Sequence, residues 1–176
     1  MAAVTPFETS DLANASKTLL AFGENVKDLQ GDLQMLGDIS QGNGEKFKSL
    51  ALVFGQIKSA GRLMGQDLLQ LVNVGFNPLQ IIAKQTGKSM ADLKKDMENG
   101  KISFEMVADA MKSATSEGGL FYESMEKQSK TITGMLSTLK DNLAEFGRDA
   151  GEKAFEQVKD SLQSLLDMID KAAKDG

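Results

Sequence analysis

The chain has 176 residues, of which 41% are hydrophobic and 26% charged, a balance typical of a folded globular domain rather than a disordered one. Its formal net charge of −5 argues against a general nucleic-acid binder, which needs a basic surface to displace counterions from phosphates. The sequence contains no Cys and no His, so thiol chemistry, disulfides and the usual zinc, haem and iron–sulfur ligands are excluded. We therefore expect no metal site and no cofactor.

Helical periodicity runs through nearly the whole chain, and the first third is predicted to form three helices. The first runs to Phe22 and is capped by Ser10-Asp11, and the second spans about residues 25–36. Its expected core face consists of Val26, Leu29, Leu33 and Leu36. A loop is predicted at 40–44, followed by a third helix over about 45–60. The core stripe of that helix consists of Phe47, Leu50, Val53, Phe54 and Ile57.

The middle of the chain, residues 61–114, reads as short amphipathic helices with a glycine at nearly every joint. Glycine can adopt the left-handed conformation that ends a helix, serine can cap the next one, and proline suits a first helical turn. Helices are predicted over about 66–74 and 78–86, then after Ser89 and after Ser103, while residues 101–103 could hold one extended pair. The predicted structural turns are Gly61, Gly65, Gly75, Pro78, Gly87, Gly100, Gly118 and Gly119.

The two short helices on either side of Gly100 also suggest a DNA-reading helix-turn-helix. The second of them, however, carries Glu105, Asp109 and Lys112, a poor set of side chains for binding phosphates. We therefore favour structural packing for this pair and expect no direct reading of nucleic acid.

The last third of the chain changes character, because no proline follows Gly118 and apolar residues recur every three or four positions. The first part of this apolar stripe consists of Met125, Ile132, Leu136, Leu139, Leu143 and Phe146. Four-residue steps follow and act like a stutter in a coiled coil. The fold class is therefore predicted to be all-α, with a compact helical domain over 1–117 and a rod-like helical segment over 118–176. The stripe would suit self-association as well as burial on the preceding domain.

The sequence offers little chemistry that would support an enzyme. The acidic residues Asp92, Asp96 and Glu98 are expected on the exposed face of a short helix, and residues 42–46 lack the spacing of a phosphate-binding loop. The N-terminus has no signal-peptide pattern, and the longest uncharged run, 68–83, is too short and too polar for a stable membrane span. We expect neither a catalytic residue nor a membrane-spanning segment.

A series of short sequence blocks extends from about residue 14 to residue 151. The blocks before the glycine-jointed region are TLLAFG at 18–23, LGD at 36–38 and LALVFGQ at 50–56. Those after it are GGLFY at 118–122, MEKQSK at 125–130 and LKDN at 139–142. In this order, and together with 61–114, they resemble the N-terminal domain of phage and prophage tail tape measure proteins. One departure is that Phe76 and Asn77 precede Pro78, where many members of that family have a glycine-aliphatic pair.

The resemblance implies a structural role in tail assembly: the family fills the tail tube of long-tailed phages and sets its length. It also implies partners, namely tail tube subunits and tail assembly chaperone or initiator proteins, and a location in the lumen of the virion tail after assembly in the bacterial cytoplasm. Even a fully helical chain of this length would reach only about 260 Å, so we expect a fragment of a longer protein. Two alternatives remain, a helical adaptor module of another assembly or secretion machine and an envelope-active pore-forming domain.

Overall fold

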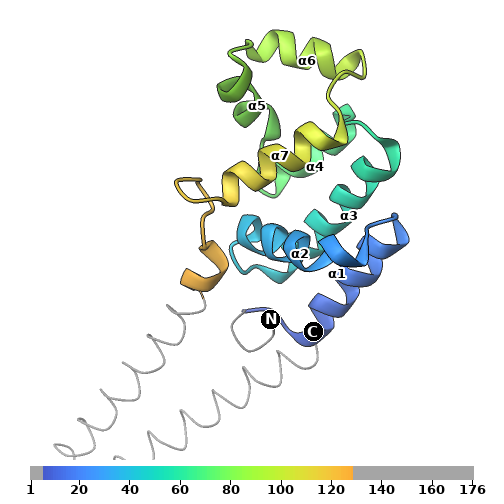
Figure 1. The fold of residues 1–176 in the computed structure, drawn as a ribbon, viewed down its shortest axis with the longest axis vertical. Coiled ribbons are helices and arrows are strands. Elements are labelled where there is room, and N and C mark those ends of the chain that lie inside the picture. Colours follow the sequence, from blue (N-terminus) through green and yellow to red (C-terminus); the bar gives the residue numbers. More distant parts are fainter. Residues whose placement is uncertain (1–5, 129–176) are drawn as a thin grey trace, which may run out of the picture. The chain divides into compact units, whose positions relative to one another are not determined.

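The computed structural model describes residues 6–128, and this part of the chain is all-α (Figure 1). It contains seven helices: α1 (Thr9–Ala21), α2 (Val26–Ser40), α3 (Gly44–Ala60), α4 (Gly65–Asn73), α5 (Pro78–Thr86), α6 (Met90–Glu98) and α7 (Phe104–Thr115). Residues 124–128 are also helical. Extended pairing within residues 6–128 is limited to one antiparallel bridge between Arg62 and Ser103. The predicted all-α class is confirmed for this part of the chain, and so is the extended pair at 101–103.

Local sequence signals determine where the short helices begin. The side chains of Ser89 and Ser103 accept hydrogen bonds from the backbone N–H groups of Asp92 and Met106, at 3.1 and 3.3 Å. Pro78 is the first residue of α5, where its missing N–H leaves no hydrogen bond unmade. These starts agree with the predictions because each depends on side chains within a few residues of the helix end.

Three predictions in the N-terminal part were wrong. The first helix begins at Thr9 with Glu8 at its N-cap, so Ser10 and Asp11 lie within the helix and do not cap it. The other two errors concern tertiary contacts. The second helix continues past Leu36 to Ser40, because residues 37–40 are buried in the fold rather than placed in a loop. A Cβ on Gly37 would lie 2.8 Å from the sulfur of Met125, so glycine permits this close approach. Val26 was expected in the core but is 76% exposed, since it begins α2 beyond the packed region.

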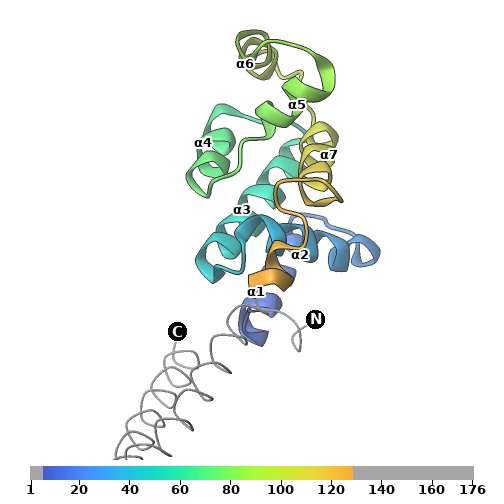
Figure 2. The same cartoon turned by 90° about the vertical axis from the view of Figure 1, so that its left-hand side faces the viewer.

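Helix α3 lies at the centre of the described unit, and all five residues of its predicted stripe are at most 1% exposed. Helices α1 and α2 pack on α3, and Figure 2 shows α4 and α7 on opposite sides of it. Helix α7 also contacts α2 and α5, whereas α6 packs on α5 at the end of the unit farthest from α1 (Figure 1). The chain thus buries one continuous core that uses a face of every helix.

The compact unit spans Met1–Ser129 and includes Phe121 and Met125, which are 5% and 7% exposed. Both residues had been assigned to the rod-like segment, so the core extends past residue 117. Most of the predicted rod lies outside the described residues, and the division into 1–117 and 118–176 stays a prediction.

Candidate functional site

The predicted structural turns occupy the joints between helices. Five of the glycines have positive φ angles: Gly61 (+70°), Gly75 (+94°), Gly87 (+72°), Gly100 (+71°) and Gly118 (+81°). Gly65 instead begins α4, and Pro78 begins α5. A Cβ on Gly119 would collide with the backbone oxygen of Ala114. Backbone geometry therefore favours glycine at the five left-handed joints, and steric space favours it at Gly119.

The fold brings several of these joints together in pairs that the sequence does not show. The joints at Gly61 and Gly100 meet at the single bridge, where Leu63 N–H donates to Ile102 O at 2.8 Å and Phe104 N–H donates to Gly61 O at 3.1 Å. Gly75, Gly118 and Gly119 line one cavity of about 370 Å³ between α5 and the segment after α7. The glycine joints therefore end helices and also form contacts between segments that are distant in the sequence.

Replacing Gly100 with valine is expected to lower the free energy of unfolding by about 1–2 kcal/mol, because a β-branched side chain would be held in a left-handed conformation. The new Cβ would also lie 2.6 Å from the Arg62 guanidinium, which would have to move. Thermal unfolding measures the effect. The matched control is Gly65→Ala, since Gly65 has open space around its Cβ position and no positive φ. Equal melting temperatures for the two variants would contradict the assigned role of Gly100.

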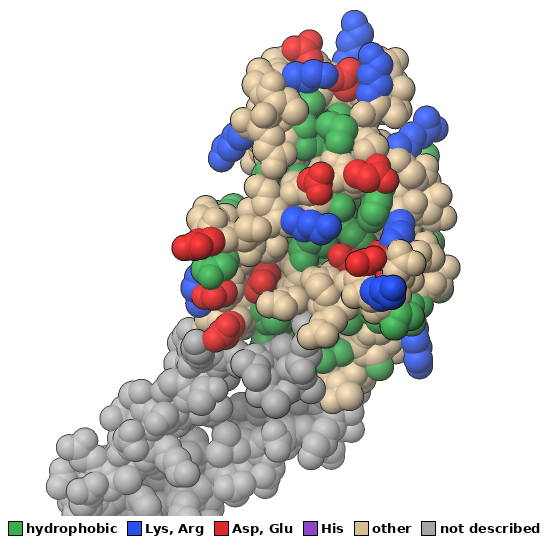
Figure 3. Space-filling view, in the orientation of Figure 1, with side chains coloured by type: hydrophobic (Ala, Val, Ile, Leu, Met, Phe, Trp, Pro, Cys, Tyr) green, Lys and Arg blue, Asp and Glu red, His purple; other side chains and the backbone are tan. Residues whose placement is uncertain are grey.

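A groove of about 490 Å³ is bordered by α2, α3 and α7. In the space-filling view, acidic and basic side chains surround hydrophobic atoms between α7 and α2 (Figure 3). The apolar lining comes from Met35, Phe54, Phe104 and Ala108. The charged lining consists of four acidic residues and three lysines: Glu24, Asp28, Asp32 and Asp38, with Lys27, Lys58 and Lys112.

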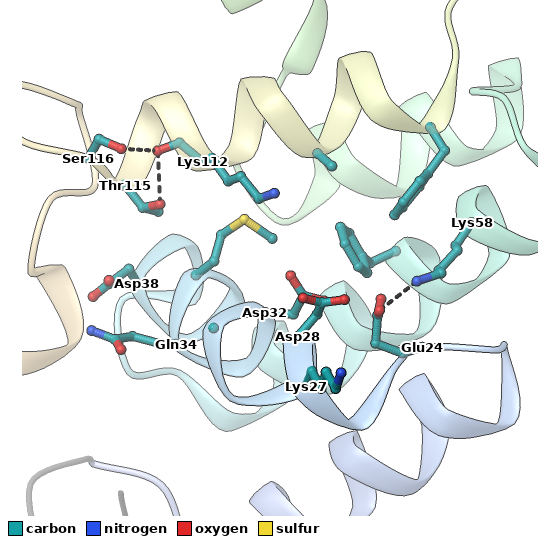
Figure 4. A pocket seen from close by; sticks show the side chains of 15 residues that line it. Glu24, Lys27, Asp28, Asp32, Gln34, Asp38, Lys58, Lys112, Thr115 and Ser116 are labelled. Atoms are coloured by element: carbon teal, nitrogen blue, oxygen red, sulfur yellow. Dashed lines mark hydrogen bonds and ion pairs between the residues drawn. The ribbon is translucent and has the colours of Figure 1, made fainter.

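Glu24 and Lys58 form the ion pair of this groove, with Nζ 2.5 Å from Oε1 (Figure 4). The Glu24 side chain is only 2% exposed and also accepts a hydrogen bond from the backbone N–H of Asn25 at 2.9 Å. Burial by itself would raise the pKa of Glu24, but the hydrogen bonds from Lys58 and Asn25 outweigh it and lower the pKa. Glu24 is therefore held as a carboxylate.

Asp32 is 8% exposed, lies next to Glu24 and forms no ion pair with a cation of residues 6–128. Burial, followed by a hydrogen bond and charge repulsion from Glu24, raises the pKa of Asp32 to about 7. Lys112 and Lys58 oppose this shift only weakly, through longer-range attraction. Asp32 and Glu24 thus form a buried carboxyl pair in which Asp32 holds a proton at mildly acidic pH and Glu24 stays ionised.

Asp38 lies at the other end of the groove and links α2 to the end of the described chain. Its Oδ1 accepts a hydrogen bond from the backbone N–H of Met125 at 3.0 Å, in a buried position. Burial raises the pKa of Asp38, and the bond from Met125 offsets part of this shift. Asp38 therefore fixes residues 124–128 against α2.

Sequence reasoning did not find the buried carboxyls at Glu24, Asp32 and Asp38. One signal was present: acids at 24, 28 and 32 follow a four-residue spacing, which places like charges on one side of a helix. Acidic residues are usually exposed at the protein surface, so the spacing by itself does not indicate burial.

A comparison with protein families identifies the chain. A family model described as "Tape measure protein" matches residues 1–152. The chain belongs to the tape measure protein family. This confirms the resemblance seen in the sequence blocks and places the chain among structural phage proteins.

Two curated tape measure relatives are similar to the chain. They are the "Probable tape measure protein" of Lactococcus phage p2 and that of Lactococcus phage SK1, each 24% identical over 192 residues. Each match covers 95% of this chain but 19% of the relative, so the chain spans about a fifth of the length of the curated relatives it matches. No solved structure matches the chain.

Residues 6–128 of this tape measure chain contain neither a metal-ligand cluster nor a membrane-spanning helix. This part contains no group of three or more acidic residues arranged to hold a metal ion. None of its helices has the length and apolar character to cross a membrane. The uncharged run 68–83 is divided between α4 and α5, and Leu71, Phe76, Leu79 and Ile82 are each at most 2% exposed.

Helix α7, the second helix of the possible DNA-reading pair, contributes one face to the core. Helix α7 buries Val107, Ala110 and Met111 at 0% exposure, and its N-terminus is joined to the bridge at Arg62. Its charged residue Lys112 lines the groove next to α2. Helix α7 thus packs in the core through its apolar face, and the absence of direct nucleic-acid reading stays a prediction.

Proposed function

We propose that this chain is part of a tape measure protein that sets the length of a phage tail tube during assembly, and that it acts as a structural component rather than as an enzyme. The family match over residues 1–152 carries the proposal. Under it, residues 6–128 supply a folded, helical assembly domain, and a longer helical remainder of the parent protein supplies the ruler. The partners are tail tube subunits and tail assembly chaperone or initiator proteins, and the location is the lumen of the virion tail.

The physical basis of the ruler is the constant rise of a helix. An α-helix advances about 1.5 Å per residue, so a helical segment of fixed length defines a fixed distance for the polymerising tube. The described unit cannot provide this distance, because it folds its helices back onto α3 rather than extending them. Length must therefore come from residues outside it.

The first experiment determines the reading frame that contains this chain and then deletes helical residues within it. Removing about 100 residues of helix beyond position 176 is expected to shorten tails by about 150 Å, measured by electron microscopy. Gly65→Ala in the same frame serves as the control and should leave tail length unchanged. A frame that ends near residue 176, or deletions that leave tail length constant, would rule out the ruler mechanism.

A further inference from the structure

We propose that the groove between α2 and α7 is a binding site for an arginine side chain of a partner protein, whose guanidinium contacts the carboxyls of Asp32 and Glu24. This inference goes beyond the tail-length role and does not depend on it. It is derived from an imbalance of charge in a buried position, together with a cavity that has apolar walls.

The charge imbalance is local and concerns Asp32. The groove is lined by four carboxylic acids and three lysines, and the ammonium of Lys58 is already bonded to Glu24. Lys27 and Lys112 line the groove without forming an ion pair with any described residue. Asp32, which is 8% exposed, therefore has the Glu24 carboxyl as a hydrogen-bond partner and forms no ion pair with any described residue. A buried carboxylate without a cation is costly, and one additional positive charge would balance the set.

The position of Asp32 makes it reachable from the groove. Figure 4 shows the Asp32 and Glu24 carboxyl groups, which are hydrogen-bonded, on the α2 side of the groove. Lys112 lies across the groove on α7, and in this view a methionine side chain is drawn between its ammonium and these acids (Figure 4). A cationic group that enters the groove meets the carboxyl pair.

The walls of the groove suit arginine in particular. Met35 and Ala108 provide apolar surface for a methylene stem, which basic side chains bury while their charged head stays at a polar site. The Phe104 ring already accepts a cation, since Lys58 Nζ lies 5.5 Å from its centroid. A guanidinium presents a planar fork of N–H donors that can bond two carboxyls at once, whereas a lysine ammonium presents a point charge.

Binding is coupled to release of the proton that Asp32 holds next to the Glu24 carboxylate. A guanidinium favours the ionised pair, so it competes with that proton. Because the pKa of Asp32 lies at about 7, the apparent affinity should rise with pH up to that value and level off above it. The fraction of ionised Asp32 changes about thirty-fold between pH 5.5 and pH 8, which gives the expected change in affinity.

The test is a nuclear magnetic resonance titration of the full 176-residue chain with N-acetyl-arginine methylamide at pH 8. We expect saturable shifts at residues lining the groove and a lower titration midpoint for the Asp32 carboxyl carbon. The citrulline analogue has nearly the same shape without the charge and is expected not to bind.

Asp32→Asn should weaken binding by about ten-fold or more, the range for loss of a charge-assisted hydrogen bond. Asp109→Asn removes an exposed acid of α7 that does not line the groove and should leave binding unchanged.

Two results would overturn the proposal. One is the absence of saturable shifts, or equal binding of the arginine and citrulline probes. Either result would show that the groove does not recognise the positive charge of the guanidinium. The other concerns the native lysine across the groove. If the Asp32 carboxyl titrates below pH 5 without ligand, and Lys112→Met restores a midpoint near 7, then Lys112 supplies the missing cation within the chain. A Lys112→Met chain that binds the arginine probe at least as tightly as wild type would support the site.

Discussion

Replacing Phe54 with alanine is expected to lower the free energy of unfolding by about 3–5 kcal/mol, the usual cost of emptying a buried phenylalanine site. Phe54 is 1% exposed on α3, the helix on which α1, α2, α4 and α7 pack. Its ring meets that of Phe104 edge to face, with centroids 5.1 Å apart, so truncation also removes an aromatic contact between α3 and α7. Chemical denaturation followed by circular dichroism measures the change.

The matched control for Phe54 lies two residues away on the same helix. Leu52 is 42% exposed, so Leu52→Ala removes an apolar side chain without leaving a buried cavity. That variant should change the free energy of unfolding by about 0.5 kcal/mol or less. A loss for Phe54→Ala no larger than that for Leu52→Ala would show that α3 is not the central core helix.

The second large effect is a fall in stability with rising pH that originates at Asp32. The folded-state pKa of about 7 lies above the unfolded value near 3.8, so the folded chain binds the proton more tightly. The stabilisation is therefore complete below about pH 4 and is lost progressively as the pH rises to 7. Between pH 5 and pH 7.5 the free energy of unfolding should decrease by about 2–3 kcal/mol.

Glu24 contributes in the opposite direction and in a different window. Its folded-state pKa is lowered from 4.5, so its stabilisation is present above that pH and is lost as the pH falls below it. Between pH 5 and pH 7.5 the change in the free energy of unfolding therefore reports the titration of Asp32 and not that of Glu24. Denaturation curves at several pH values within this interval measure the effect.

Asp32→Asn is the diagnostic variant for this effect. Asparagine has nearly the same shape as a protonated aspartate and can still donate a hydrogen bond to Glu24. The variant should lose most of the pH dependence between 5 and 7.5 and be more stable than wild type at pH 8. Asp38, whose pKa is also raised by burial, contributes a remaining change of the same sign. A variant that retains the wild-type slope would show that another group titrates in this range.

Much of the fold was predictable because its determinants are local. The starts of α5, α6 and α7 depend on Pro78, Ser89 and Ser103, each of which acts within three residues of the helix end. The apolar stripe of α3 was predictable as well, because the 3.6-residue period places its members on one face whatever they contact. The end of α2 was not predictable from the sequence, because the burial of residues 37–40 depends on Met125, which lies far along the chain.

The sequence by itself determined that this chain is helical, where its short helices begin, and which family it belongs to. Each of these depends on spacing and on the order of blocks along the chain. The tertiary structure alone decided that Glu24 and Asp32 lie buried beside Lys58, since residues 34 positions apart meet there at the packing of α2 on α3. The physical reason is that a carboxylate has no preferred side of a helix until packing removes water from it. Burial and charge balance, unlike helical period, are properties of the assembled fold.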